Sequence, residues 1–276
     1  MPAVSTTTVP GTPVQGQHAA AMRLVVAWQH PDGGLIEPVG FVSYDGRLYR
    51  FAYISNALSV EGFQPLLGFD DLRREYVSEQ LFPLFAQRAM DVRRPDYPRY
   101  VASLGLSGEP EPWKQIARSQ GLRRGDTLQL VPEPVVHDGM LDYPFLVNGI
   151  RHVHEEPLRL ETGDMRVSRD EVEAALQSLK PGGRLDLVPE PRNPVNPCAI
   201  VVASSGVPVG WVPDLLAGDI RQLMKITTLH TAADHVNGHE APSHLRLLAR
   251  LKARPPGGFQ FFVGEKWELI AEDSRQ

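Results

Sequence analysis

Proline and glycine restrict this chain to short structural elements. The sequence holds 25 prolines and 24 glycines among 276 residues. Proline interrupts helices and interior strands because it lacks an N–H donor, and glycine favours turns. Long alternating βαβ units are therefore disfavoured, and we predict a β-rich α+β protein with many turns. A chain of this length can form two modest domains.

The charge of the chain limits the ways in which it can bind nucleic acid. The formal net charge is −5, and basic and acidic residues are interspersed in both halves without a basic block. Sequence-independent affinity for duplex DNA comes mainly from Lys and Arg that neutralise phosphates. A general duplex-binding protein is therefore disfavoured, whereas a small site that holds one strand end is compatible with this charge.

The sequence carries no export signal and a single cysteine. Residues 1–21 lack both the basic and the apolar region of a secretory signal, and no stretch approaches the roughly 20 apolar residues that span a bilayer. Their composition predicts a disordered tail, and residues 271–276 a second. Cys198 alone can form neither an intrachain disulfide nor a cysteine-rich zinc site. We expect a cytoplasmic protein that has no cofactor and does not contact membranes.

Residues 22–120 predict a small β-hairpin and helix domain. Runs rich in aromatic and β-branched residues at 36–43 and 48–54 flank Asp45-Gly46, which is typical of a β-hairpin. A further strand is expected at 23–29. The helices of this domain are expected at 72–90, 98–106 and 112–120.

Residues 121–270 predict a second, more β-rich domain with two helices. The clearer helix begins after Ser168, which forms a capping box with Glu171, and ends at Gly182-Gly183. The second begins at Pro213 or Asp214 and continues through residue 225. Strands are expected at 143–154, 199–203, 207–212, 245–253 and 259–263, with a polar, His-rich loop at 227–242.

A seven-residue phrase occurs twice in this half. Residues 128–134 (LQLVPEP) and 185–191 (LDLVPEP) differ at one position. Each phrase alternates like a strand and is then stopped by proline. We therefore expect two strands that leave their sheet in a similar way on either side of one module.

Three ordered phrases carry most of the functional information. They are VNGIRH at 147–152, NPVNPCAIVV at 193–202 and VGWVP at 209–213. The Asn-Pro pairs favour rigid turns, in which the Asn side chains bond nearby backbone or point outward. Gly210 permits close approach of another backbone segment, and Trp211 supplies a flat aromatic surface beside the turn.

Together these phrases resemble the HIRAN family. The resemblance covers about residues 122–270, with the helix after Ser168 as an insertion. It implies an OB-like HIRAN-type β-barrel that binds single-stranded DNA, often at a free 3′-hydroxyl end. It also implies that Arg151 contacts a phosphate, that His152 stacks on the terminal base, and that Asn193 lines the nucleotide pocket. Asn196 stands where the family often has an Asp that reads the terminal hydroxyl.

One departure from the family pattern weakens base stacking. Val195 stands where a Tyr can stack, and it has no π-face to replace an interaction of about 1–3 kcal/mol per base. Trp211, Phe259 or Phe261 could compensate. The expected DNA-binding residues are Arg151, His152, Arg192, Asn193, Asn196, Trp211 and Phe259. The alternative is structural, with Asn193, Pro194, Asn196 and Gly210 only building turns, Arg151 in an internal ion pair and Trp211 in the core.

Residues 36–106 resemble the small N-terminal subdomain of HipA-type toxin kinases. The shared features are the glycine-punctuated strand pair, the Pro65-Leu66 phrase and the LFPLF motif at 81–85. No Gly-rich phosphate loop and no kinase catalytic phrase is present. The resemblance implies an interaction module that docks a protein partner.

Catalytic chemistry has little support in the sequence. Histidines at 230, 235, 239 and 244 suggest a metal site, but Asn237-Gly238 would break the helix that could align two of them. We expect no metal site and no enzyme activity. Two alternatives to DNA binding remain open. One is a protein–protein adaptor or regulator of a HipA-like toxin or defence system, and the other is a metal-dependent enzyme that uses these histidines.

Overall fold

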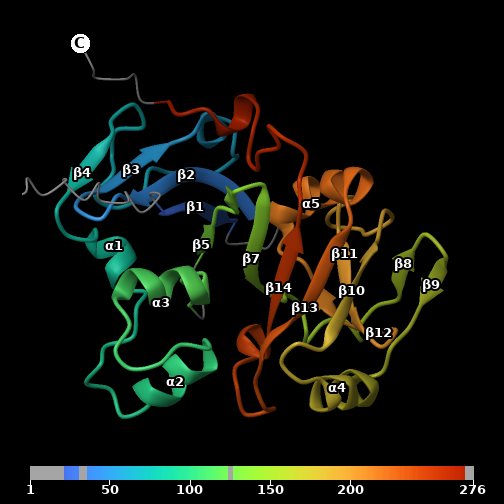
Figure 1. The fold of residues 1–276 in the computed structure, drawn as a ribbon. Helices are drawn as coiled ribbons and strands as arrows, with labels where there is room; N and C mark the ends of the chain where they lie inside the picture. Colours follow the sequence, from blue (N-terminus) through green and yellow to red (C-terminus); the bar gives the residue numbers. More distant parts are fainter. Residues whose placement is uncertain (1–21, 31–35, 124–126, 271–276) are drawn as a thin grey trace, which may run out of the picture.

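The computed structural model describes residues 22–30, 36–123 and 127–270. The expected tails at 1–21 and 271–276 lie outside these ranges. The protein is β-rich and of mixed α+β type, as the sequence predicts, with two large antiparallel sheets. Figure 1 shows the N-terminal sheet, in blue, beside the second sheet, which runs from green to red.

The first sheet has five strands in the order β4-β3-β2-β1-β5. The strands are β1 (Met22–Gln29), β2 (Ile36–Tyr44), β3 (Tyr49–Tyr53), β4 (Tyr76–Ser78) and β5 (Leu128–Pro132). The predicted hairpin is confirmed by the antiparallel pairing of β2 with β3. In its turn, the Asp45 carboxylate accepts the N–H groups of Arg47 and Leu48 at 2.9 and 2.8 Å. Strand β5 follows the expected domain boundary at residue 121, yet it pairs with β1 of the preceding half. The boundary therefore stays a prediction.

The N-terminal half also contains short helices. They are the 3-10 helix η1 (Ser55–Leu58), α1 (Pro83–Ala86), α2 (Tyr97–Ser103) and α3 (Pro112–Ser119). The helices expected at 98–106 and 112–120 are confirmed. The helix expected at 72–90 is confirmed only at α1, and an earlier part of the range is β4, which pairs with β3. Aromatic packing explains the difference, since Tyr76 contacts Phe69, and Phe69 and Phe85 both pack on Phe51.

The second sheet has seven strands in the order β12-β11-β10-β13-β14-β7-β6. The strands are β6 (Val136–His137), β7 (Met140–Leu146), β10 (Arg184–Pro189), β11 (Ile200–Ser204), β12 (Val207–Trp211), β13 (Leu229–Val236) and β14 (Leu247–Ala253). A separate hairpin contains β8 (Leu158–Leu160) and β9 (Gly163–Met165). The predicted hairpin around 204–206 is confirmed as the β11–β12 pair.

One bridge joins β12, at one end of this strand order, to the residues after β7, near the other end. Asn148, just after β7, exchanges two backbone hydrogen bonds of 2.8 Å with Trp211 at the end of β12. Because β12 and β7 are otherwise separated by four strands, the sheet must curl to bring these residues together. The closed OB-like barrel itself stays a prediction.

Both predicted helices of this half are confirmed. They are α4 (Arg169–Ser178) and α5 (Asp214–Ile226), the second beginning directly after Pro213. The capping box is formed: the Ser168 hydroxyl accepts the Glu171 N–H, and the Glu171 carboxylate accepts the Ser168 N–H at 2.8 Å. These two reciprocal bonds satisfy donors at the start of α4.

Three other predictions for this half are wrong. Half of the polar loop expected at 227–242 is strand β13, whose Thr231 and Ala233 are buried. The strand at 143–154 ends at Leu146, because Gly149 turns the chain with a φ of +69°. Residues 259–263 form no strand, since Phe261 and Phe262 turn into the core instead.

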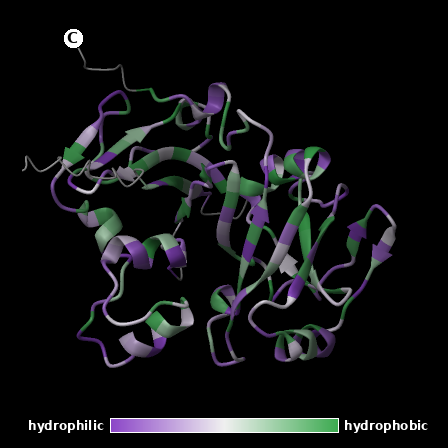
Figure 2. Cartoon of the chain, in the orientation of Figure 1, coloured by the Kyte–Doolittle hydropathy of each residue, from purple (hydrophilic) through white to green (hydrophobic). Residues whose placement is uncertain are grey.

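The two sheets share one hydrophobic core. Val25, Phe41 and Ile54 of the first sheet belong to the same buried cluster as the interior of the second. Trp267, in η3 (Glu265–Trp267), packs between them, 4.5 Å from the Phe262 ring centre and 6.0 Å from that of Phe41. Figure 2 shows hydrophobic residues concentrated along the strands of both sheets. In the ranges described, no helix has the length and apolar character needed to cross a membrane.

We expect Tyr53→Phe to destabilise the first sheet. The fully buried Tyr53 hydroxyl donates to the Phe69 carbonyl and accepts the Leu66 N–H at 2.8 and 2.7 Å, and burial raises its pKa to about 12. Leaving both partners unpaired should lower the free energy of unfolding by about 1–3 kcal/mol in urea titrations. Tyr44→Phe, which removes an exposed hydroxyl, should cost under about 0.5 kcal/mol. Equal costs for the two variants would contradict this assignment.

Candidate nucleic-acid interface

A buried carboxylate organises the corner where β10 ends. Glu190 is 2% exposed and follows β10 directly. One carboxylate oxygen accepts the backbone N–H of Arg159 at 2.8 Å. The other accepts the side-chain amide of Asn193 and the indole N–H of Trp211, each at 2.8 Å. Three donors from separate segments therefore compensate the cost of burying this charge.

The two asparagines of the Asn-Pro corner are engaged within their own loop. The Asn193 side-chain oxygen accepts the N–H groups of Val195 and Asn196 at 2.9 and 3.0 Å. The Asn196 oxygen accepts the Cys198 N–H at 2.8 Å, and its amide donates to Asp214 at 2.9 Å. These bonds hold the double turn that the sequence predicts. They give both asparagines the structural role that was the alternative to DNA contact.

Arg192 connects this loop to the β8–β9 hairpin. Its guanidinium donates to the Leu160 carbonyl at 3.2 Å and pairs with Asp164 at 2.9 Å. Because Asp164 occupies this cation, Arg192 has less positive charge to offer an external anion than its exposed position suggests.

Trp211 is half-buried and held in one orientation. Its ring lies on Gly149, where an added Cβ would come within 2.5 Å of the ring. At Gly210, with φ +148°, an added Cβ would come within 2.5 Å of the Asn148 carbonyl. Both positions therefore require glycine, because β12 comes very close to the turn after β7. The sequence predicts such a close approach at Gly210.

Arg151 and His152 lie in the turn that follows Gly149. The Arg151 Nε–H donates to His152 Nε2 at 2.7 Å, and His152 Nδ1 contacts the Glu155 carboxylate at 2.8 Å. This chain places the imidazole proton on Nδ1, because Nε2 acts as the acceptor. Among the described residues no carboxylate forms an ion pair with Arg151, so its terminal amino groups remain available to an anion.

The seven predicted residues fall in three places. Four of them surround or adjoin Glu190: Arg192, Asn193, Asn196 and Trp211. Arg151 and His152 lie in the neighbouring turn, and Arg151 lines a groove of about 660 Å³ that extends towards α4. Phe259 packs on Phe261, with ring centres 5.3 Å apart, and lines a different groove with Arg23 and Glu133.

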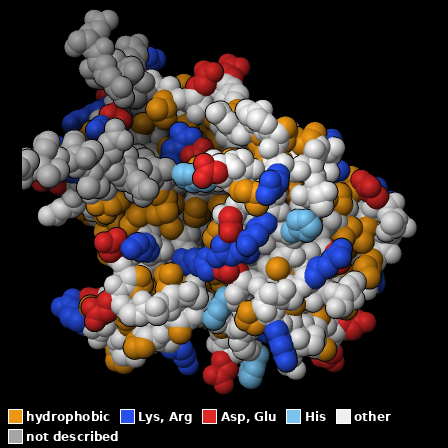
Figure 3. All heavy atoms as spheres, viewed as in Figure 1, with side chains coloured by type: hydrophobic (Ala, Val, Ile, Leu, Met, Phe, Trp, Pro, Cys, Tyr) orange, Lys and Arg blue, Asp and Glu red, His pale blue; other side chains and the backbone are white. Residues whose placement is uncertain are grey.

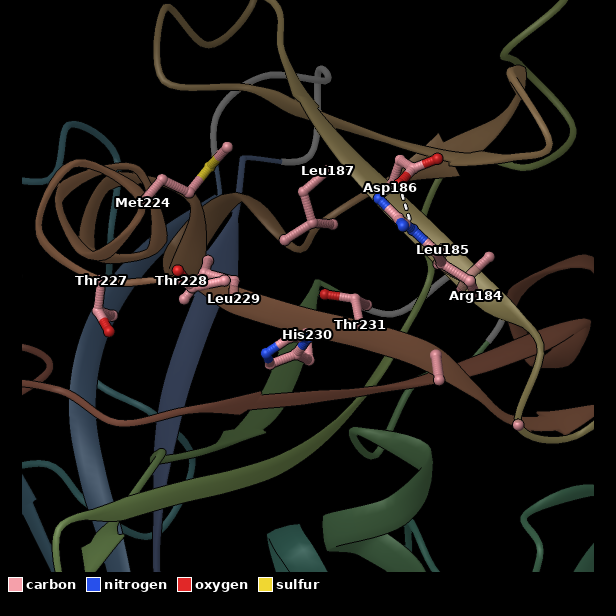
Figure 4. Close-up of a pocket in the computed structure, with 12 residues that line it drawn as sticks. Arg184, Leu185, Asp186, Leu187, Met224, Thr227, Thr228, Leu229, His230 and Thr231 are labelled. Atoms are coloured by element: carbon pink, nitrogen blue, oxygen red, sulfur yellow. Dashed lines mark hydrogen bonds and ion pairs between the residues drawn. The ribbon is translucent and has the colours of Figure 1, made fainter.

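A larger cavity lies where β10 and β13 diverge. Its volume is about 790 Å³, and Figure 4 shows the residues that line it. Pairing of the two strands ends at Leu185 and Thr231, and the Thr231 hydroxyl is buried without a hydrogen-bond partner. None of the seven predicted residues lines this cavity.

Charged side chains elsewhere on the visible face are mostly paired. Figure 3 shows basic and acidic side chains side by side across the middle of the molecule. Arg250 bridges Asp142 and Asp234 at 2.8 Å each, and Arg118 also pairs with Asp234. Such paired cations do not form a continuous path for phosphates.

Little in the sequence indicates that Glu190 is the centre of the site. Its only signal is the repeated phrase, since Glu133 occupies the equivalent position of the first copy and pairs with Arg23. Both copies form a strand that ends at the proline before the glutamate. Within the described ranges, His, Cys, Asp and Glu side chains form no group of three suited to a metal ion.

Comparison with solved structures finds a similarity to the HIRAN domain of human HLTF. The TM-score is 0.26 and the sequence identity 16%, over 41% of this chain and 72% of that chain. No protein-family model and no curated protein matches the sequence. At this TM-score the similarity does not define the fold of the chain.

We expect Glu190→Gln to loosen the whole corner. A glutamine cannot accept from all three donors, so the free energy of unfolding should fall by about 1.5–3 kcal/mol. The indole N–H resonance of Trp211, assigned with Trp211→Phe, should shift in ¹H–¹⁵N spectra. Glu155→Gln removes an exposed carboxylate and should cost under about 1 kcal/mol. An unchanged indole resonance in Glu190→Gln would contradict the role given to this carboxylate.

Proposed function

We propose that this protein binds the end of single-stranded DNA, without catalysis, at the surface formed by Trp211 and the turn at 149–155. The observation that supports this most is the half-buried Trp211 ring, which Glu190 fixes against Gly149. The same turn carries Arg151, which has no ion-pair partner among the described residues. A nucleobase can stack on an aromatic ring, and an arginine can hold the adjoining phosphate.

Rigidity at Trp211 favours this use. Its indole N–H donates a hydrogen bond to Glu190, and its backbone N–H and C=O both form hydrogen bonds with Asn148. A ring that is already ordered loses little conformational entropy when a base stacks on it. This preorganisation distinguishes Trp211 from a mobile surface side chain.

The acidic groups nearby favour a short footprint. Glu155 and Asp214 lie beside the turn and the Asn-Pro corner, where they would repel a long phosphate chain. A strand end presents few phosphates and a free hydroxyl. The Asn196 oxygen accepts one backbone bond and keeps a second lone pair, so it can accept a bond from that hydroxyl.

The second sheet and the N-terminal residues have separate roles in this function. We take the curled second sheet, joined by the Asn148–Trp211 bridge, as an OB-like barrel of HIRAN type. The N-terminal residues 22–120 then act as a HipA-like module that docks a protein partner. The protein works in the cytoplasm as an accessory factor and not as an enzyme.

We expect labelled ten-nucleotide strands with a 3′-hydroxyl to bind more tightly than strands with a 3′-phosphate. Trp211→Ala should weaken binding by about 1–3 kcal/mol, or roughly 5- to 150-fold, because base stacking is lost. Arg151→Ala should reduce the slope of log affinity against log salt by about 0.7, the value for one phosphate contact to a single strand.

Matched variants control for indirect effects. Trp28→Ala removes a half-buried tryptophan from the first sheet, and Arg184→Ala removes an exposed arginine of β10. Neither should alter DNA affinity. Absence of binding at low salt would overturn the proposal and leave the adaptor function, in which the N-terminal module acts without DNA.

A further inference from the structure

Three separate segments form the groove that Arg151 lines. They are the turn at 149–155, the beginning of α4, and residues 239–246. The basic side chains that line it are Arg151, His154, Arg169, His239 and Arg246, and the acidic ones are Glu155 and Glu173. A groove with this lining is a candidate for an anion.

One of the two acidic side chains is already paired with a basic one. The Glu173 carboxylate accepts two bonds, at 3.0 and 2.9 Å, from the buried guanidinium of Arg246. The Glu155 carboxylate accepts a hydrogen bond of 2.8 Å from His152 Nδ1 and keeps its negative charge. Among the described residues, no carboxylate forms an ion pair with Arg151 or Arg169. Two arginines with no ion-pair partner therefore line one groove.

The stability of α4 explains the position of Arg169 only in part, because its charge acts favourably on Glu173 one turn later in the helix. Arg169 is the first residue of the helix, where the positive end of the helix dipole disfavours a cation. The positive charge of Arg151 also acts on His244, which lies next to the lining residue Ser243: burial, and to a smaller degree Arg151, lower the pKa of His244. An anion in the groove is attracted by both Arg151 and Arg169, which line it.

We propose that this groove is a second phosphate subsite, in which Arg169 holds the phosphodiester next to the one held by Arg151. This inference rests on the proposed function, and it directs the bound strand from Trp211 past Arg151 to α4. The helix is the insertion relative to the HIRAN resemblance, so the subsite is a property of this chain. The ligand is a phosphodiester of single-stranded nucleic acid.

Removing Arg169 should remove one phosphate contact while the strand still binds. We expect Arg169→Gln to weaken binding of the ten-nucleotide strand several-fold and to reduce the salt slope by about 0.7. A 3′-hydroxyl dinucleotide, which has only one internucleotide phosphate, should bind the variant and the parent protein equally. Urea unfolding of Arg169→Gln should match that of the parent, because the Ser168 and Glu171 capping box is retained.

Arg166→Gln is the matched control. Arg166 is an exposed arginine three residues earlier that does not line the groove. If Arg169→Gln behaves like Arg166→Gln while Arg151→Gln still weakens binding, the second subsite is overturned and the proposed function stands. If no variant and no parent protein binds DNA, both fail.

A further titration separates strand phosphates from free phosphate. Inorganic phosphate, added at constant ionic strength, should displace the strand only weakly. If inorganic phosphate binds the parent protein in calorimetry, loses that binding in Arg169→Gln, and the DNA salt slope is unchanged by the substitution, the groove is a free-anion site. That result would overturn the assignment to a DNA strand.

Discussion

The buried carboxylate of Glu190 holds together three segments that the sequence keeps far apart. It accepts bonds from Arg159 in strand β8, from Asn193 in the loop, and from Trp211 at the end of β12. A buried charge is costly unless its oxygens are hydrogen-bonded, so the three donors and the carboxylate stabilise one another's positions. The orientation of Trp211, and with it the candidate interface, depends on this one side chain.

Structural elements encoded by local signals were predictable from the sequence. The Asp45 turn and the Ser168 capping box each form their bonds within three residues, and both appear in the structure. Strand β13 was missed because its exposed face is polar. Asp234, for example, pairs with Arg250 and with Arg118, which lies 116 residues away. Such a strand reads as a loop until its distant partners are known.

The candidate site was predictable in part. The sequence indicated the Asn-Pro corner and the approach of Gly210 to another segment, because turns and glycines have local conformational requirements. It could not indicate that Glu190 is buried, since a glutamate between two prolines is usually exposed. It also could not indicate that Arg169 and Arg151 line the same groove, because the two residues come together only when the chain folds.

The most direct test is a ¹H–¹⁵N titration of the full chain with an unlabelled ten-nucleotide strand bearing a 3′-hydroxyl, at low salt. The Trp211 indole resonance and the amides of residues 149–155 should shift first, in proportion to one another and to saturation. The amides of the first sheet should not move. Shifts confined to the cavity between β10 and β13, or to the groove beside Phe259, would contradict a DNA-binding surface organised by Glu190.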